Sequence, residues 1–221
     1  MQTYVVIVAG GAGKRMGSVL PKQFLLLKNK PVLYYTINAF LNALPECKVI
    51  VVLPEEHLEL GKEIVDGFFD AQRIQLTVGG ETRFHSVQNG LKLVEEESII
   101  FVHDGVRCLV KEELIQRCYT TALETGSAVP AIECRDSVRM MTEEGNDPVD
   151  RSKLRLVQTP QTFHSKILLA AFAIDYKPWF TDEANVVEAF GLKVTLVQGD
   201  DTNIKITNPI DLVIAEKILE D

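Results

Sequence analysis

The sequence predicts an α/β fold, a Rossmann-like and mainly parallel sheet flanked by helices. One observation is a series of apolar runs of strand length, at residues 4–9, 49–53, 74–78, 99–102, 128–132 and 193–197. A second is that helical patterns separate most of these runs, at about 31–43, 55–67, 83–94, 111–125, 165–173, 182–190 and 209–219. Such alternation is typical of a parallel sheet. A third is that glycine or polar residues follow several of the runs, at the strand ends where such sheets bind ligands.

The length and composition predict one soluble domain over residues 1–221. The chain is 46% hydrophobic and 24% charged, and its formal net charge is −8. A general nucleic-acid-binding protein should be basic, so nucleic acid is not an expected partner. An anionic substrate would have to be met by a local cluster of basic side chains.

Targeting and cysteine patterns predict a cytoplasmic protein. The start, MQTYVVIVAGG, lacks the charged region of a signal peptide. No apolar run approaches the ~20 residues of a membrane span, so no membrane association is expected. The four cysteines, at positions 47, 108, 118 and 134, form neither Cys-x-x-Cys nor a zinc-like pairing with histidine. We expect reduced and mostly buried thiols.

The first apolar run leads into the sequence AGGAGKRM, residues 9–16. A P-loop would need glycine in place of Val8 and Ser or Thr in place of Arg15. A dinucleotide fingerprint would need Gly or Ala in place of Met16. The glycines at 10, 11 and 13 still allow the backbone to approach a ligand closely, and successive N–H groups in such a turn bind anions. The alternative is a plain turn between strand and helix.

Three cations surround this glycine turn. Lys14, Arg15 and Lys22 lie within a span of nine residues, and Pro21 stiffens the chain just before Lys22. Arg can hold two phosphate oxygens at once, whereas Lys acts as a point charge. We interpret the group as a phosphate clamp, with a solvated basic loop as the alternative.

A second glycine turn follows the run at 74–78. The sequence GGETR, residues 79–83, leads into a helical pattern that carries Ser86. Exposed backbone groups at Gly79 and Gly80 could read the edge of a base. The alternative is a helix start that binds no ligand.

His103 and Asp104 end the run at 99–102. Asp is a poor strand residue, and a carboxylate at a strand's carboxyl end points into the ligand crevice. Such an Asp commonly holds Mg²⁺ that bridges nucleotide phosphates, although a turn or cap role is the alternative. For His103 we expect a structural hydrogen bond rather than a metal ion.

Residues 133–157 interrupt the alternation of strand and helix. A turn pattern at 144–148 is flanked by the strand-like segments 137–141 and 153–157. This predicts a β-arm of two strands that projects from the main sheet.

Near the C-terminus, Lys205 stands among apolar neighbours in the sequence NIKIT, residues 203–207. Its side chain either extends along apolar surface to water or points at an anion.

Six motifs occur in order across nearly the whole chain: AGGAGKRMGSVLPKQF, GGETRFHS, HDGVR, VDRSKLRLVQTPQTF, TDEA and NIKIT. Together they resemble the 2-C-methyl-D-erythritol 4-phosphate cytidylyltransferase family, which has a nucleotidyltransferase-type fold. The related ribitol-5-phosphate cytidylyltransferases share much of this pattern. Val149-Asp150-Arg151 ahead of the QTPQ sequence favours the erythritol enzymes.

The resemblance implies a site made from several segments. Residues implied to stabilise the reacting phosphoryl group or to position the reactants are Arg15, Lys22 and Lys205. Residues implied to bind the nucleotide are Ala9, Gly10, Gly11, Gly13, Lys14, Gly79, Gly80, Ser86 and Asp104. Residues implied to bind the polyol phosphate are Arg107, Ser137, Arg151, Thr159 and Thr181.

The resemblance also implies a reaction. CMP would pass from CTP to 2-C-methyl-D-erythritol 4-phosphate in the non-mevalonate isoprenoid pathway, with Mg²⁺ as cofactor and Asp104 as a metal ligand. The family forms homodimers through an exchanged arm, which residues 133–157 would supply. A regulatory module that binds nucleotide without turnover is an alternative of another class, but binding alone does not require Lys14, Arg15 and Lys22 together.

The chain departs from the family pattern at three positions. Thr202 stands where Asp is common, so Asp200 or Asp201 would have to replace it. Ser137 stands in place of Thr and keeps the hydroxyl. Gly105 stands in place of Ala, which we expect to matter little.

Overall fold

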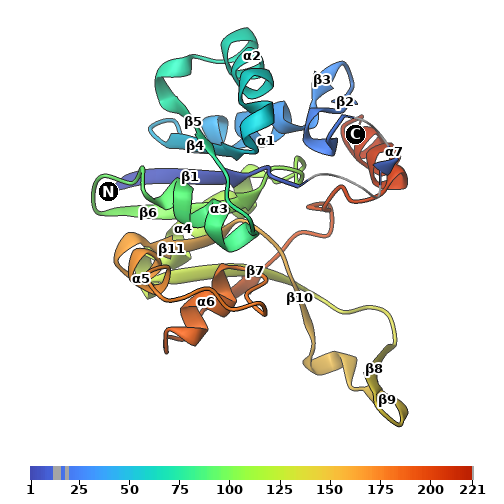
Figure 1. Cartoon of the computed structure of the whole chain (residues 1–221). Coiled ribbons are helices and arrows are strands. Elements are labelled where there is room, and N and C mark those ends of the chain that lie inside the picture. The colour runs from blue at the N-terminus through green and yellow to red at the C-terminus, as the bar shows by residue number, and fades with distance from the viewer. Residues whose placement is uncertain (12–15, 18–19, 221) are drawn as a thin grey trace.

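A mixed, mainly parallel sheet forms the centre of the molecule (Figure 1). The computed structural model describes residues 1–11, 16–17 and 20–220. The strand order is β10-β7-β11-β6-β1-β4-β5, and β12 pairs with β7 outside this path. The strands are β1 (Gln2–Val8), β4 (Lys48–Leu53), β5 (Ile74–Val78), β6 (Ser98–Asp104), β7 (Ser127–Glu133), β10 (Arg155–Val157), β11 (Gln161–His164) and β12 (Leu196–Gln198). β10 and β11 run antiparallel to their neighbours, and the other pairs are parallel.

Helices cover both faces of this sheet. They are α1 (Val32–Ala43), α2 (Leu58–Phe68), α3 (Arg83–Leu91), α4 (Glu112–Thr125), α5 (Ser165–Ala171), α6 (Glu183–Ala189) and α7 (Pro209–Ile218). Val5 and Ile7 of β1 pack in one core with α1, α2 and α4, whereas Tyr4 and Val6 pack in the other with α3, α5 and α6. Both faces of β1 are therefore buried, which explains why its sequence is continuously apolar rather than alternating.

The predicted α/β fold is confirmed, with differences at short elements. β11 was missed because the four residues QTFH carry no apolar run. β12 covers residues 196–198 rather than 193–197. A small hairpin of β2 (Leu26–Leu27) and β3 (Lys30–Pro31) was also missed, and its turn places Lys28 and Asn29 at φ of 46° and 65°. Four short 3-10 helices complete the described elements: η2 (Lys22–Phe24), η3 (Glu55–His57), η4 (Ala71–Arg73) and η5 (Arg151–Lys153).

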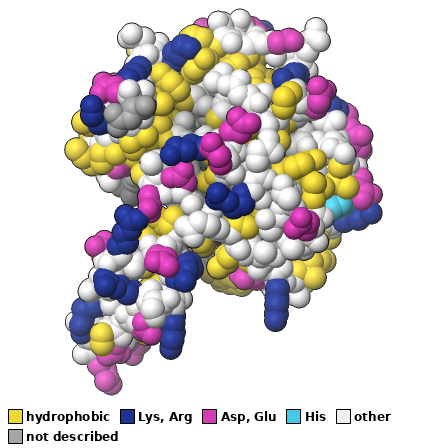
Figure 2. Space-filling model, turned by 180° about the vertical axis from the view of Figure 1, so that it is seen from behind, with side chains coloured by type: hydrophobic (Ala, Val, Ile, Leu, Met, Phe, Trp, Pro, Cys, Tyr) yellow, Lys and Arg dark blue, Asp and Glu magenta, His cyan; other side chains and the backbone are white. Residues whose placement is uncertain are grey.

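The arm exists, but its second strand was predicted at the wrong place. β8 (Val138–Thr142) pairs with β9 (Gly145–Val149), so the turn falls at residues 143–144. Residues 155–157, expected in the arm, form β10 of the main sheet instead. Gly145 has φ of 143°, a conformation that side-chain-bearing residues rarely adopt, and this fixes the earlier turn. The hairpin stands away from the sheet (Figure 1) and carries charged side chains of both signs (Figure 2).

The described helices include none that is long and apolar enough to cross a membrane. All four cysteines are free, and three of them, Cys47, Cys108 and Cys118, are buried as expected. Burial raises the pKa of the Cys108 and Cys118 thiols to about 12, which keeps both groups protonated at neutral pH.

Candidate active site

A cavity of about 310 Å³ opens where β1 and β6 end, at the edge predicted from the sequence. Three stretches form much of its wall: residues 8–11 after β1, residues 80–83 at the start of α3, and Asp104 at the end of β6. Lys22 and Lys205 add two cationic side chains. The structure therefore brings together Ala9, Gly10, Gly11, Gly80, Ser86, Asp104, Lys22 and Lys205 of the predicted set. Gly13, Lys14 and Arg15 lie outside the described residues.

The residues after the first glycine turn are tied back to the sheet. Gln23, which is almost fully buried, donates from Nε2 to the carbonyl of Ala9 over 2.6 Å. Its neighbour Lys22 is also buried and donates from Nζ to the carbonyl of Ile206 over 2.8 Å. The 3-10 helix η2 thus holds the end of β1 and the segment around Lys205 at fixed places beside the cavity.

The second glycine turn is closed by Ser86. The hydroxyl of Ser86 accepts from the N–H of Gly80 over 3.1 Å and donates to the carbonyl of Thr82 over 3.0 Å. A Cβ on Gly80 would stand 2.4 Å from Cβ of His85, so a larger residue would disrupt the turn. A Cβ on Gly79 would stand 3.0 Å from the Ser86 hydroxyl. These glycines therefore have a local packing role in addition to any contact with a base.

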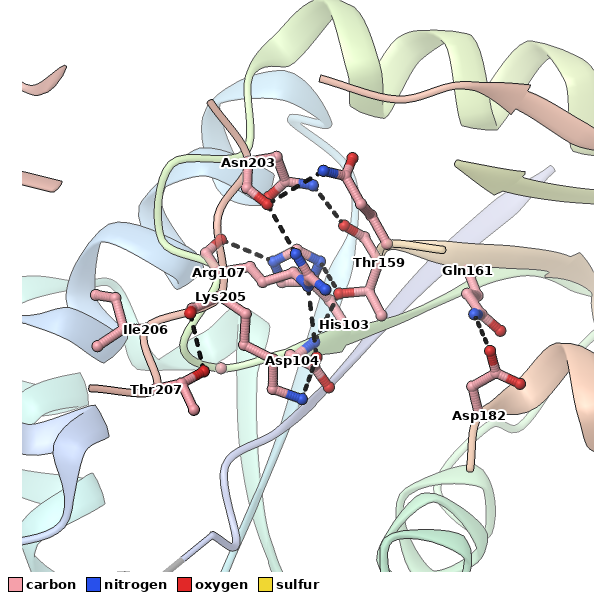
Figure 3. Close-up of polar contacts among 12 residues, drawn as sticks. His103, Asp104, Arg107, Thr159, Gln161, Asp182, Asn203, Lys205, Ile206 and Thr207 are labelled. Atoms are coloured by element: carbon pink, nitrogen blue, oxygen red, sulfur yellow. Dashed lines mark hydrogen bonds and ion pairs between the residues drawn. The ribbon is translucent and has the colours of Figure 1, made fainter. Parts of the chain in front are cut away.

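Asp104 is the electrostatic centre of the cavity. Oδ1 lies 3.3 Å from Arg83, and Oδ2 lies 2.9 Å from Nζ of Lys205 and 3.5 Å from Nε of Arg107. Burial alone would raise the pKa of Asp104, but the charges of Arg83, Lys205 and Arg107 outweigh it and hold the pKa well below its ordinary range. Of the two alternatives for Lys205, the structure shows the side chain pointing at an anionic group (Figure 3).

Hydrogen bonds behind Asp104 fix the end of β6 (Figure 3). The carbonyl of Arg107 lies 3.0 Å from Nε2 of His103, so this nitrogen carries the proton. Nδ1 of His103 then accepts from the Thr159 hydroxyl over 3.0 Å, and that hydroxyl accepts from the N–H of Asp104 over 3.1 Å. Arg107 also donates to the carbonyl of Asn203 over 2.8 Å. Burial lowers the pKa of His103 to about 4, so the ring is neutral, and its expected structural role is confirmed.

Sequence reasoning missed three polar residues of this site: Gln23, Arg83 and Glu183. The position of Arg83, directly after a glycine turn at a strand end, is a signal that could have identified it. Glu183 is fully buried and pairs with Arg83. It lies in the TDEA motif, but its residue type and position alone match an ordinary acidic residue in a first helical turn. Gln23 follows Lys22 without any pattern of its own.

The residues implied to bind an acceptor are dispersed within one chain. Ser137 and Arg151 are exposed and belong to the arm, and neither is among the described residues that line the cavity. Arg151 instead lines a separate hollow with Arg135 and Arg155. Thr181 lies just before α6 and donates to Asn185 over 2.6 Å. The hydroxyl of Thr159 is already engaged with Asp104 and His103, so a contact with an acceptor would compete with those bonds.

The side chains around Asp104 could hold a metal ion only if a bound nucleotide supplied some of the metal's ligands. Within the described part of the chain, no three His, Cys, Asp or Glu side chains are arranged to hold one. Mg²⁺ commonly takes one or two carboxylates and receives its other ligands from phosphates and water. Asp104 can supply one such carboxylate, which would then contact both the metal ion and Lys205. Neither Asp200, which pairs with Lys111, nor Asp201, which pairs with Arg135, lines the cavity, so neither replaces the aspartate that Thr202 displaces.

Gly105 lies close to the end of β1 and the start of the first glycine turn. A Cβ at this position would stand 2.8 Å from Cβ of Ala9 and 3.3 Å from the carbonyl oxygen of Val8. Because these neighbours belong to β1 and to the start of the glycine turn, they have little room to shift. Alanine at this position would therefore require a shift in this chain, and the expectation that the glycine itself matters little stays a prediction.

Comparison with known proteins decides the family. The profile of the 2-C-methyl-D-erythritol 4-phosphate cytidylyltransferase family matches residues 3–221. The chain belongs to this family. The Bacteroides fragilis protein of that name is 46% identical over 215 residues, which cover 97% of this chain and 98% of the relative. The protein from Bacteroides thetaiotaomicron is 44% identical, with 99% and 100% covered.

Solved structures of family members have the same fold. The 2-C-methyl-D-erythritol 4-phosphate cytidylyltransferase of Thermus thermophilus is 31% identical, with a TM-score of 0.78 and 100% of both chains covered. The 4-diphosphocytidyl-2C-methyl-D-erythritol synthase of Anaerococcus prevotii is 26% identical, with a TM-score of 0.85, and 100% of this chain and 99% of the other are covered. The cavity around Asp104 is therefore placed in a nucleotidyltransferase-type α/β fold.

Proposed function

We propose that this chain transfers the CMP group of CTP to 2-C-methyl-D-erythritol 4-phosphate. The products are 4-diphosphocytidyl-2-C-methyl-D-erythritol and pyrophosphate. Membership of the family supports the choice of reaction. The observation that carries it is the cationic cavity between two glycine turns, which Lys22 and Lys205 line and in which Lys205 contacts the carboxylate of Asp104.

The chemistry requires positioning and charge stabilisation. The acceptor's phosphate oxygen attacks the α-phosphorus of CTP while the bond to pyrophosphate breaks. This nucleophile is already an anion, so no general base is needed. Lys22, whose ammonium group is fixed at the cavity wall, meets negative charge that grows on the α-phosphoryl oxygens, together with Arg15. Lys205, which lines the same cavity and contacts Asp104, helps to position the reacting phosphates.

The two glycine turns hold the nucleotide. Gly10, Gly11, Gly13 and Lys14 receive the triphosphate through backbone N–H groups and one cation. Gly80 and Ser86 line the cavity at the other turn, and Gly79 precedes them, which supports a role for backbone groups there in reading the cytosine edge. Glycine and serine leave this space open to a flat base.

Mg²⁺ is the proposed cofactor, and Asp104 is the residue that would hold it. When bound, the ion supplies positive charge to the nucleotide phosphates and to the departing pyrophosphate. Arg83 and Arg107, which contact the same carboxylate, keep Asp104 ionised and therefore able to act as a ligand.

The acceptor site is proposed to lie between two copies of the chain. Arg107 and Thr181 come from the chain that holds the nucleotide, with Thr159 supporting Asp104. Ser137 and Arg151 stand on an arm that extends away from the main sheet (Figure 1), and neither lines the cavity of its own chain, so they would serve the neighbouring subunit of a homodimer. The exposed apolar side chains of Met140 and Met141 on this arm favour contact with another surface.

Pyrophosphate release from CTP, measured across a panel of polyol phosphates with Mg²⁺ present, tests the proposed function. We expect turnover with 2-C-methyl-D-erythritol 4-phosphate to exceed turnover with ribitol 5-phosphate. A reversed preference would assign the chain to ribitol activation. CTP binding without pyrophosphate release from any acceptor would instead indicate a regulatory nucleotide-binding protein.

A further inference from the structure

Arg83 and Glu183 join two segments that the proposed reaction assigns to different substrates. Arg83 is the first residue of α3 and directly follows the turn that we assign to cytosine. Glu183 is the first residue of α6 and directly follows Thr181 and Asp182 on the acceptor side. Nη1 and Nη2 of Arg83 both donate to the Glu183 carboxylate, with 3.1 Å between Nη2 and Oε2. The contact is bidentate and therefore fixes the plane of the guanidinium group.

The same guanidinium group extends the contact to the centre of the cavity. Nε of Arg83 lies 3.3 Å from Oδ1 of Asp104, and Oδ2 of Asp104 lies 2.9 Å from Lys205. Charges of alternating sign thus run from α6 across the cavity to the segment at 203–207. Arg83 lines both the cavity and a small hollow beside Thr181. Glu183 is fully buried and is not among the described residues that line the cavity, so it can act there only through Arg83.

Aromatic packing links the same two segments a second time. The ring of Phe84, the neighbour of Arg83, lies 5.7 Å from the ring of Phe180, the neighbour of Thr181. Phe180 in turn contacts Trp179 with ring centroids 4.6 Å apart. Trp179 is the only tryptophan in the sequence and is 58% exposed, so its fluorescence reports on this segment.

A contribution to folding stability is a weak explanation for the buried ion pair of Arg83 and Glu183. Burial raises the pKa of Glu183, and the charge of Arg83 only limits this rise, so the pair forms at a cost in desolvation. Well-packed apolar residues of similar volume often replace a buried ion pair without loss of stability. An amide, Gln161, already fastens the start of α6 to the sheet through Asp182 and the N–H of Ala184.

We propose that Arg83 and Glu183 are a positioning pair that couples the nucleotide turn to the acceptor segment at Thr181. Binding of a cytidine triphosphate and binding of a polyol phosphate then strengthen each other, and the ion pair carries much of this coupling. The proposal rests on the proposed function, because it takes Thr181 as part of the acceptor site.

The experiment measures this coupling without turnover. The nucleotide used is α,β-methylene-CTP, whose α,β-bridge resists cleavage. Calorimetry measures its Kd twice, once without the acceptor and once with saturating 2-C-methyl-D-erythritol 4-phosphate. In the wild-type chain we expect the acceptor to tighten nucleotide binding about fivefold or more. In Glu183→Gln, which keeps the side chain's size and loses its charge, the ratio should fall to within about twofold of one, with a smaller change in the Kd of the nucleotide alone.

Glu188→Gln is the matched control. It removes the same charge from an exposed position of the same helix and should keep the wild-type ratio. A second readout needs the nucleotide alone: saturation should shift the Trp179 emission in the wild-type and Glu188→Gln chains but not in Glu183→Gln. If Glu183→Gln does not fold, Arg83→Lys provides the same test, because Lys cannot hold both carboxylate oxygens in one plane.

An unchanged coupling ratio and an unchanged Trp179 response in folded Glu183→Gln would overturn the proposal. So would a ratio of one in a wild-type chain that turns over both substrates normally. If the wild-type chain releases no pyrophosphate with this acceptor, the proposed function fails instead. The Trp179 response to nucleotide then still decides whether the ion pair links the two segments.

Discussion

In the cavity, Asp104 contacts three cations that come from α3, from the loop after β6 and from the segment at 203–207. In the arm, β8 contacts chiefly its own hairpin partner β9, and nearly every residue of the pair is exposed. The cavity is therefore held by contacts between residues distant in sequence, whereas the β8–β9 hairpin is held chiefly by local pairing. A hairpin of this kind is only marginally stable by itself, so the arm needs another surface to fix its position.

The largest effect should come from the cavity. Lys22→Ala removes a buried ammonium group that bonds the carbonyl of Ile206 and lines the cavity, where we propose that it meets the reacting phosphates. We expect kcat to fall about 10²- to 10³-fold, with a smaller loss in CTP affinity, because the lost interaction is made mainly in the transition state. Steady-state kinetics combined with calorimetry of CTP binding gives both values. If affinity and kcat fall together, Lys22 acts mainly in ground-state binding.

A mixture of two inactive variants tests whether the arm serves the other subunit. Lys22→Ala damages the cavity of its own chain, and Arg151→Ala damages the proposed contact with a neighbour's acceptor. In a mixed dimer both lesions fall on one site and the other site is intact. With random exchange of equal amounts, about a quarter of all sites recover. Unfolding and refolding the two proteins together should restore about that share of wild-type activity.

Mass spectrometry of the refolded sample verifies that mixed dimers are present. If they are and activity stays low, Arg151 serves its own chain or no acceptor at all. The arm would then differ from the cavity in how it is packed, but it would have no role in the neighbouring subunit's site.

Adding one methyl group should lower stability at a tightly packed glycine and not at an open one. Gly105→Ala introduces a Cβ only 2.8 Å from that of Ala9, and we expect a loss of about 1–3 kcal/mol in the free energy of unfolding. Gly67→Ala is the matched control, because a Cβ there meets nothing within 4 Å and the helix gains about 0.5–1 kcal/mol. Urea denaturation of both variants measures the difference. Equal stabilities would show that β1 shifts easily.

Acid should weaken the cavity before it affects the arm. The pKa of His103 falls from 6.5 to about 4 on folding. Between these two pH values His103 is protonated in the unfolded chain and neutral in the folded chain. Stability is therefore lost as the pH falls from about 6.5 to about 4. His103→Gln, which can still donate and accept, should reduce this slope in urea melts at successive pH values. A slope equal to that of the wild-type chain would contradict the buried neutral histidine.

The smallest effect should come from the hairpin. Met141 is 77% exposed, so Met141→Thr should change the free energy of unfolding of a single chain by no more than about 0.5 kcal/mol. The change is measured at a protein concentration low enough to keep the chain monomeric. A larger loss would mean that the arm packs within its own chain.

The sequence predicted the elements that have a local apolar pattern and missed those that depend on contacts between distant residues. β1, β4 and β6 are buried on both faces, so their apolar runs identified them. The first glycine turn follows β1, the second follows β5, and Asp104 ends β6. β10 and β11 are short and run antiparallel, and their position depends on pairing with β7, which no local pattern encodes. The role of Glu183, which lies in the TDEA motif, likewise depends on its partner Arg83, which is one hundred residues away.

The place of β1 in the sheet also bears on how the chain can be made. β1 is paired on one side by β4 and on the other by β6, where Val8 lies opposite Asp104. At about 5–20 residues per second, a ribosome would take several seconds to produce β6 after β1 has emerged. During that interval one edge of an apolar strand has no neighbour within its own sheet, and it can pair with other chains. The central position that buries β1 in the finished protein thus makes it the strand most in need of protection during synthesis.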